Sequence, residues 1–167
     1  MKTRITMLLL LVTGCLNWLG VAAMAQTPEP PTLKPGWKPI DAGGRFSFHL
    51  PEDMQPQNVH GIDSYVGEYR NKNLRVTFDY GLYSNSLDTL SSQPEYKEFN
   101  RVIGGRKAKI VYYRATDAAA EYKYYAAVYF PAAPSHRASN LNLSAEFNDK
   151  HEWETAQTIF ESIRFRL

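Results

Sequence analysis

The 167-residue chain contains a single cysteine, Cys15, which lies within the first 25 residues. Because residues 26–167 hold no thiol, disulfide bonds, cysteine nucleophiles and cysteine-ligated zinc are excluded from a domain built from them. These residues also lack an excess of charge, since 17 bases remain beside 17 acids once Lys2 and Arg4 are set aside. A neutral domain has no electrostatic basis for holding nucleic acid, so we expect no nucleic-acid partner.

Motifs that assemble catalytic or cofactor sites are also missing from the sequence. The four histidines are scattered and form no His-x-His or His-Glu-x-x-His pattern; they are His49, His60, His136 and His151. No Gly-x-Ser-x-Gly elbow is present, and no glycine-rich loop has the spacing that cradles phosphates. The sequence therefore predicts no metal, no cofactor and no nucleophilic catalytic residue.

The first 25 residues have the three regions of a bacterial export signal. A short basic start with Lys2 and Arg4 precedes an apolar run from Ile5 to Val12, and Ala23-Met24-Ala25 supplies the small residues that signal peptidase requires. Residues 1–25 are therefore interpreted as a signal peptide cleaved before Gln26. A membrane anchor is the weaker reading, because polar and glycine residues interrupt the apolar stretch.

Cys15 offers a second route of processing. Val12-Thr13-Gly14-Cys15 resembles the lipobox of bacterial lipoproteins, in which the cysteine is lipidated. An apolar stretch follows Cys15 in place of a polar tether, so cleavage after Ala25 is favoured. We expect an exported protein, periplasmic or secreted; the alternative is a protein anchored to the envelope by a lipid on Cys15, and a membrane is a partner only in that case.

Residues 26–40 contain five prolines and are predicted to form a linker or an extended arm, with Trp37 docked on the domain. Residues 41–167 then form a single domain. From Arg45 onward, apolar and polar residues alternate with the period of a half-buried strand. We expect strands over residues 45–50, 64–70, 74–83, 96–103, 106–114, 122–130 and 141–147.

Two short loops and one helix complete the predicted fold. Residues 71–73 and the Gly104-Gly105 pair are typical of hairpin turns. From Asp149 to Arg164, apolar residues recur at helical spacing, and Asn148 or Asp149 is expected to cap the helix. The sequence thus predicts the α+β class: an antiparallel β-sheet of about six to seven strands with an amphipathic C-terminal helix packed on one face.

Three segments of the chain resemble motifs of the PsbP-like superfamily. They are residues 44–51 (GRFSFHLP), residues 104–108 (GGRKA) and residues 156–165 (AQTIFESIRF). The resemblance covers about residues 44–167 and implies an antiparallel sheet between helices, although no helix signal follows the first strands here. The superfamily includes photosystem II extrinsic proteins, a nuclear-import factor that binds a small GTPase, and bacterial secreted proteins or lipoproteins of unknown role. It therefore implies a fold without fixing a function.

Alternation within the strands predicts one sheet face that is rich in tyrosine and charge. The candidate binding residues on it are His49, Tyr69, Asp79, Lys109, Tyr113, Tyr125 and Tyr129. Such a face is either solvated and partly covered by residues 33–40 or 87–94, or it binds an unknown protein or small ligand. We expect a non-enzymatic binding or accessory module of the cell envelope. The alternative is a small envelope hydrolase that uses carboxylates and His49, which requires a cleft joining His49 to Asp79 or Glu68.

Overall fold

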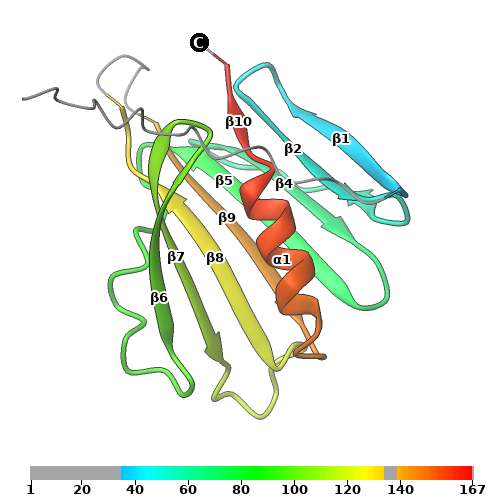
Figure 1. Ribbon diagram of the computed structural model, residues 1–167, viewed down its shortest axis with the longest axis vertical. Helices are drawn as coiled ribbons and strands as arrows, with labels where there is room; N and C mark the ends of the chain where they lie inside the picture. Colours follow the sequence, from blue (N-terminus) through cyan, green and yellow to red (C-terminus); the bar gives the residue numbers. More distant parts are fainter. Residues whose placement is uncertain (1–34, 134–138, 167) are drawn as a thin grey trace, which may run out of the picture.

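The computed structural model describes residues 35–133 and 139–166, and its largest element is a seven-stranded sheet (Figure 1). The strand order is β3-β4-β5-β9-β8-β7-β6, and every neighbouring pair is antiparallel. In that order the strands span Gln55–Gln57, Tyr65–Arg70, Leu74–Gly81, Asn140–Phe147, Tyr124–Phe130, Arg106–Arg114 and Lys97–Ile103. The predicted α+β class, with its antiparallel sheet and C-terminal helix, is confirmed.

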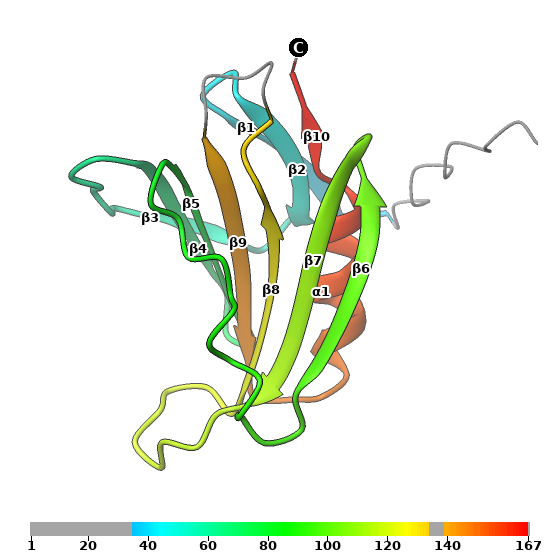
Figure 2. The same ribbon diagram turned by 90° about the vertical axis from the view of Figure 1, so that its left-hand side faces the viewer.

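A smaller sheet lies beside the helix on one face of the large sheet. It consists of β1 (Trp37–Ala42), β2 (Phe46–Pro51) and β10 (Arg164–Phe165) in the order β1-β2-β10. Figure 2 shows this sheet and helix α1 (Glu152–Glu161) on the same side of the seven-stranded sheet. We call that side of the large sheet its inner face and the opposite side its outer face.

The hydrophobic core fills the space between the inner face and this second layer. Phe46 and Phe48 of β2 are fully buried against Phe78 of β5, with ring centroids 5.3 and 6.0 Å from that of Phe78. From α1, Ile159 and Phe160 enter the same core and are also fully buried. The layer that covers the inner face therefore consists of the small sheet and α1, which is the one helix among the described residues.

The C-terminal helix is shorter than predicted, and its start differs. It spans Glu152–Glu161 with His151 as the N-cap residue and no side-chain cap. Asp149 instead accepts a hydrogen bond from the His151 backbone N–H, so the expected capping box is not formed. The helix ends because the Ser162 hydroxyl donates to the Ile159 carbonyl and the chain turns into β10.

Both predicted hairpins are present. Gly104 and Gly105 have φ values of 55° and 77°, which glycine adopts without strain, and they join β6 to β7. At the other hairpin, the Asn71 side chain accepts hydrogen bonds from the backbone N–H groups of Asn73 and Leu74. This local bonding turns β4 back onto β5.

The end of the proline-rich segment is part of the fold. Residues 37–40 lie in β1, which pairs with β2 in the small sheet. Pro39 is tolerated because β1 is an edge strand. Trp37 is half-buried against the core, as predicted.

The predicted export signal and Cys15 lie outside the described residues. No helix within residues 35–133 and 139–166 has both the length and the apolar character that crossing a bilayer requires.

Candidate binding face

The outer face is formed by alternate residues of β5, β9, β8 and β7, which pairing aligns in rows across the sheet. One row contains Asp79, Asn142, Tyr129 and Lys109, and a second contains Arg75, Glu146, Tyr125 and Tyr113. Five of the predicted binding residues thus share this face: Asp79, Lys109, Tyr113, Tyr125 and Tyr129. Period-two alternation within each strand is enough to place them together.

Tyr69 does not belong to this face, so its predicted placement is wrong. It pairs with Val76, whose side chain is buried in the inner core, and residues opposite each other on paired strands point to the same side. Its ring lies edge-on to that of Phe48, with centroids 6.2 Å apart. Tyr69 is therefore a half-buried residue that packs against the core.

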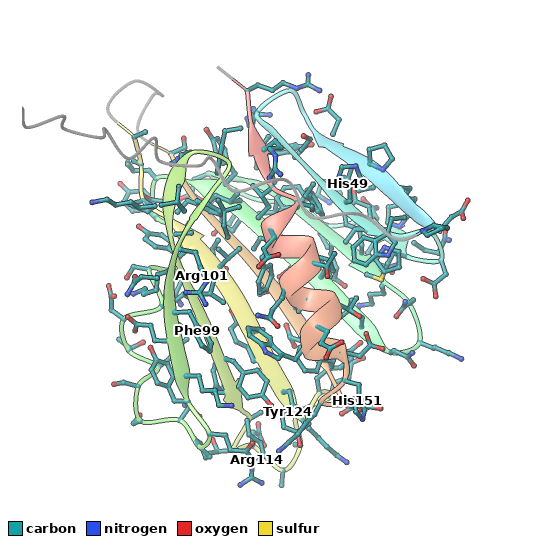
Figure 3. The ribbon with its side chains drawn as sticks, viewed as in Figure 1. His49, Phe99, Arg101, Arg114, Tyr124 and His151 are labelled. Carbon is teal, nitrogen blue, oxygen red and sulfur yellow. The ribbon has the colours of Figure 1, made fainter. Side chains whose placement is uncertain are left out.

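His49 is also misplaced by the sequence prediction. It lies on β2 of the small sheet (Figure 3), and its backbone N–H donates to the Ser162 hydroxyl at 2.9 Å. Its Nδ1 atom is buried without a hydrogen-bond partner among the described residues. Since β2 packs on the inner face, the large sheet separates His49 from Asp79 and Glu68 on the outer face. The cleft that the hydrolase alternative requires is not formed by these residues.

Part of the outer face is covered by residues 84–96, which we call the cover segment. Leu87 is buried there against Val111 and Ala127, and Leu90 packs on the same small cluster. The Asn142 side-chain amide donates to the Asn85 carbonyl at 2.8 Å, and Asp88 forms an ion pair with Lys109. Over β7 and β8 the structure therefore supports the interpretation that the face is partly covered. Residues 87–94 are the cover.

Two tyrosines of the outer face, Tyr113 and Tyr125, are partly buried. Tyr113 and Tyr125 lie with ring centroids 4.9 Å apart. Burial raises the pKa of both phenols above the ordinary tyrosine value, with nearby Tyr113 adding to the effect on Tyr125 and Glu146 to that on Tyr113. These rings are packed against each other, which leaves little of Tyr125 for a partner to contact.

The edge of the face near β4 carries a chain of ion pairs. Arg75 pairs with Glu146 and also with Glu121 at 3.5 Å, and Arg70 joins Glu121 at 3.1 Å to Glu68. The Arg75 guanidinium also lies 5.2 Å from the centroid of the Tyr122 ring. This network ties the loop containing Glu121 to the sheet. Glu68, at one end of the network, also lines a hollow of the outer face.

The uncovered part of the outer face contains a small hollow of about 250 Å³ over β4, β5 and β9. Its polar lining comes from Glu68, Thr77, Asp79 and Asn142. The Oδ1 atom of Asp79 is buried and has no hydrogen-bond partner among the described residues. Almost all buried polar atoms in proteins are paired, so this acceptor is an unusual feature of the face, as is the Nε atom of Arg75, which is also buried without a partner among the described residues.

Two apolar residues of the hollow were missed by sequence reasoning, Val59 and Val66. Gly67, which lies between Val66 and Glu68, marks the strand that carries Val66. A Cβ atom at Gly67 would lie 2.3 Å from the Phe78 ring, so only glycine lets β4 approach β5 with that ring in place. An isolated glycine inside a strand commonly marks such a close approach.

Across residues 35–133 and 139–166, no three histidine or carboxylate side chains gather in a way that would hold a metal ion. No protein-family model matches the chain, and no curated protein matches it.

Proposed function

We propose that this chain is an exported, non-enzymatic binding or accessory module of the cell envelope, and that it binds its ligand at the hollow around Asp79. The observation that carries the proposal is the buried Oδ1 atom of Asp79 without a partner. Folded proteins keep such unmet groups mainly where function requires them. The Asp79 residue lines the hollow, and its carboxylate fits a ligand that donates a hydrogen bond.

The polar groups of the hollow restrict the chemistry of that ligand. The carboxylates of Glu68 and Asp79 accept hydrogen bonds and attract positive charge, and Val59 and Val66 supply apolar contact beside them. Glu68 is already paired with Arg70, so Asp79 is the free acceptor. The ligand class is therefore a small molecule or chain end that presents hydroxyl or ammonium donors.

We further propose that the chain is a distant member of the PsbP-like superfamily. The three motif segments lie in regular elements, which supports this proposal: residues 46–51 form β2, Gly104-Gly105 joins β6 to β7, and residues 156–165 include the end of α1 and β10. The antiparallel sheet and the closing helix are features of that fold, whereas the second helical layer that the resemblance implies is not present among the described residues. Many members of the superfamily have no assigned chemistry. The resemblance is therefore compatible with a binding role but does not by itself point to one.

The test is a titration followed by ¹H–¹⁵N NMR on residues 26–167 with two probes. Diacetylchitobiose presents hydroxyl donors, and spermidine presents ammonium donors. We expect one of them to shift the amide signals of Thr77, Asp79 and Asn142 in a saturable way. Asp79→Ala should weaken that binding about tenfold or more, because it removes a hydrogen bond to a charged group.

Glu161→Ala is the matched control, since Glu161 is exposed on the helix at the opposite side of the sheet. It removes the same charge and should leave binding unchanged. Tyr69 and Tyr125 are unsuitable for such a test because their substitution disturbs packing. Equal binding by Asp79→Ala and the unaltered chain, or no response to either probe, would contradict the proposal.

A further inference from the structure

Strand β6 is the one long open edge of the described sheets. The other end of the seven-stranded sheet is β3, which has three residues and contains Pro56. In the small sheet, β1 contains Pro39 and β10 has two residues. Short strands and prolines protect sheet edges from pairing, whereas β6 has seven residues and no proline.

The two sides of β6 differ in chemistry. On the inner side, Lys97 and Arg101 flank Phe99, whose ring stacks on Trp153 of α1 with centroids 6.1 Å apart. Figure 3 shows Phe99 and Arg101 on the side of the sheet that carries the helix. On the outer side, Glu98, Asn100 and Val102 are exposed, and Val102 is 55% exposed. A strand added beside β6 would thus meet the cations Lys97 and Arg101 on the inner side. On the outer side it would meet the apolar Val102, with Asn100 and Glu98 next to it.

The outer side of β6 borders a hollow of about 750 Å³. Val102, Tyr129 and Pro131 supply apolar lining, and the lining also includes Asn100, Arg101, Lys107 and Lys109. This hollow lies over β6, β7 and β8, away from the Asp79 hollow over β4, β5 and β9. It can receive apolar side chains from an added strand.

The cations on the inner side lie near aromatic rings. Lys97 lies 5.8 Å from the Tyr112 ring centroid, and Arg101 lies 5.6 Å from that of Phe99. Neither forms an ion pair within the described residues. Cross-strand pairs of opposite charge stabilise neighbouring strands, and like charges repel.

We propose that β6 binds an extended segment of a partner protein as an added strand, and that this segment alternates acidic and apolar residues. Its acidic side chains lie opposite Lys97 and Arg101, and its apolar side chains enter the hollow beside Val102. Main-chain hydrogen bonds along the edge supply affinity, and the alternating side chains supply specificity. This partner site is separate from the proposed ligand hollow.

A second copy of the chain is a poorer occupant of the same edge. Pairing β6 with β6 of another copy brings Lys97 and Arg101 of both copies onto neighbouring strands. Arg106 and Lys107 of the neighbouring strand β7 add further positive charge near this edge. The charge of this edge therefore favours an acidic partner over self-association.

The experiment measures fluorescence anisotropy of a fluorescein-labelled heptapeptide, Val-Asp-Val-Asp-Val-Asp-Val, as residues 26–167 are added. We expect saturable binding that weakens with salt, and NMR shifts in the amides of β6. The peptide with lysine in place of aspartate should not bind. The peptide with glycine in place of valine keeps the charge but loses the apolar side chains, and it should bind about tenfold more weakly.

Two matched variants locate the site. Lys97→Glu/Arg101→Glu reverses the two edge charges and should weaken binding about tenfold or more. Lys72→Glu/Lys123→Glu makes the same change in net charge at exposed lysines away from β6, and it should bind as the unaltered chain does. Val102→Asp tests the hollow separately, because its exposed side chain is not needed for folding, and it should also weaken binding.

Three results of the binding experiments would overturn the proposal: no binding of the acidic peptide, equal weakening by the two charge-reversal variants, or amide shifts confined to strands other than β6. A stable dimer in sedimentation that Lys97→Glu/Arg101→Glu dissociates would overturn it as well, since the edge would then be occupied by a second copy. None of these results depends on the Asp79 hollow.

Discussion

The inner and outer faces of the seven-stranded sheet are covered in different ways. On the inner face, α1 and the small sheet bury a continuous set of large apolar side chains, including Phe46, Phe78 and Phe160. On the outer face, a segment without regular secondary structure covers a cluster of three buried residues: Leu87, Val111 and Ala127. The remainder of that face is held by ion pairs and hydroxyl contacts.

This difference separates stability from binding within one sheet. Apolar burial contributes most of the folding free energy, so the inner face is where the fold is determined. Polar contacts on a half-exposed face contribute little net free energy, and such a face can hold unmet groups like Asp79 without unfolding. Substitutions should therefore have large effects on the inner face and small ones on the outer face.

The strongest test of this comparison is Phe160→Ala. Phe160 is fully buried between α1 and the sheet, and truncating a buried phenylalanine costs about 3 to 5 kcal/mol. We expect the variant to be unfolded or severely destabilised in urea denaturation followed by circular dichroism. Glu154→Ala, at an exposed position of the same helix, should change the free energy of unfolding by less than about 0.5 kcal/mol. Similar values for the two variants would mean that α1 does not hold the core.

The next test is Leu87→Ala in the cover segment. We expect a loss of about 2 kcal/mol, the lower end for a buried leucine, because its cluster is small. Amide exchange should also accelerate in residues 84–96 while β5 and β9 remain protected. Leu82→Ala, which is 56% exposed in the same connection, is the control and should have little effect. Uniform acceleration of exchange would show that the cover is part of the main core.

Leu87 also has a positive φ of 64°, which a side chain with a Cβ atom adopts at a cost. Its burial and the hydrogen bond from its N–H to the Asn85 side chain, at 2.8 Å, hold it there. Leu87→Gly removes the same side chain as Leu87→Ala and relieves this strain. It should therefore be no less stable than Leu87→Ala, and a clearly lower stability would argue against strain at this position.

Strand positions and hairpins could be predicted because their signals are local. The alternation of apolar and polar residues shows which side chains of β5, β7, β8 and β9 face the core. The Gly104-Gly105 pair determines its turn locally, because both glycines adopt positive φ values. The membership of β2 in a separate sheet could not be predicted. That choice depends on which inner-face residues are free to pack on Phe46 and Phe48, which is a property of the folded sheet.

The candidate site was predicted in part for the same reason. Asp79, Tyr113 and Tyr129 follow a clear alternation, so they could be assigned to the outer face. Residues 65–69 do not alternate between apolar and polar residues, and tyrosine is compatible with either face of a sheet. The side to which Tyr69 points is therefore known only from its pairing with Val76. Sequence pattern likewise cannot show that the Oδ1 atom of Asp79 lacks a partner, since that depends on every neighbouring side chain.

A smaller effect is expected for the hydroxyl pair in the middle of the outer face. The Thr77 and Ser144 hydroxyls are 2.6 Å apart, and Ser144 also bonds to the Tyr125 phenol. Thr77→Val should cost about 1 kcal/mol. Combining it with Ser144→Ala should cost less than the sum of the two single changes, because the double variant leaves no unpaired hydroxyl in this pair. Strict additivity in chemical denaturation would show that the two hydroxyls do not interact.

The smallest effect at neutral pH is expected from the buried phenols of the covered tyrosines. Burial raises the pKa of Tyr125 in the folded protein, with Tyr113 as a further cause. As pH rises past about 10, the unfolded chain therefore loses this proton before the folded chain does. The contribution is fully present below that pH and is lost as pH rises further, so the free energy of unfolding should decrease in alkaline solution.

Tyr125→Phe removes this titrating group while keeping the packed ring. It should leave stability near pH 7 almost unchanged and make the alkaline decrease less steep. Tyr83→Phe is the control, because the Tyr83 side chain is 80% exposed. Ultraviolet absorbance of tyrosinate at increasing pH, with and without urea, measures both changes. If Tyr125→Phe and Tyr83→Phe give the same pH profile, Tyr125 is accessible to water and the cover segment does not enclose the β8 side of the outer face.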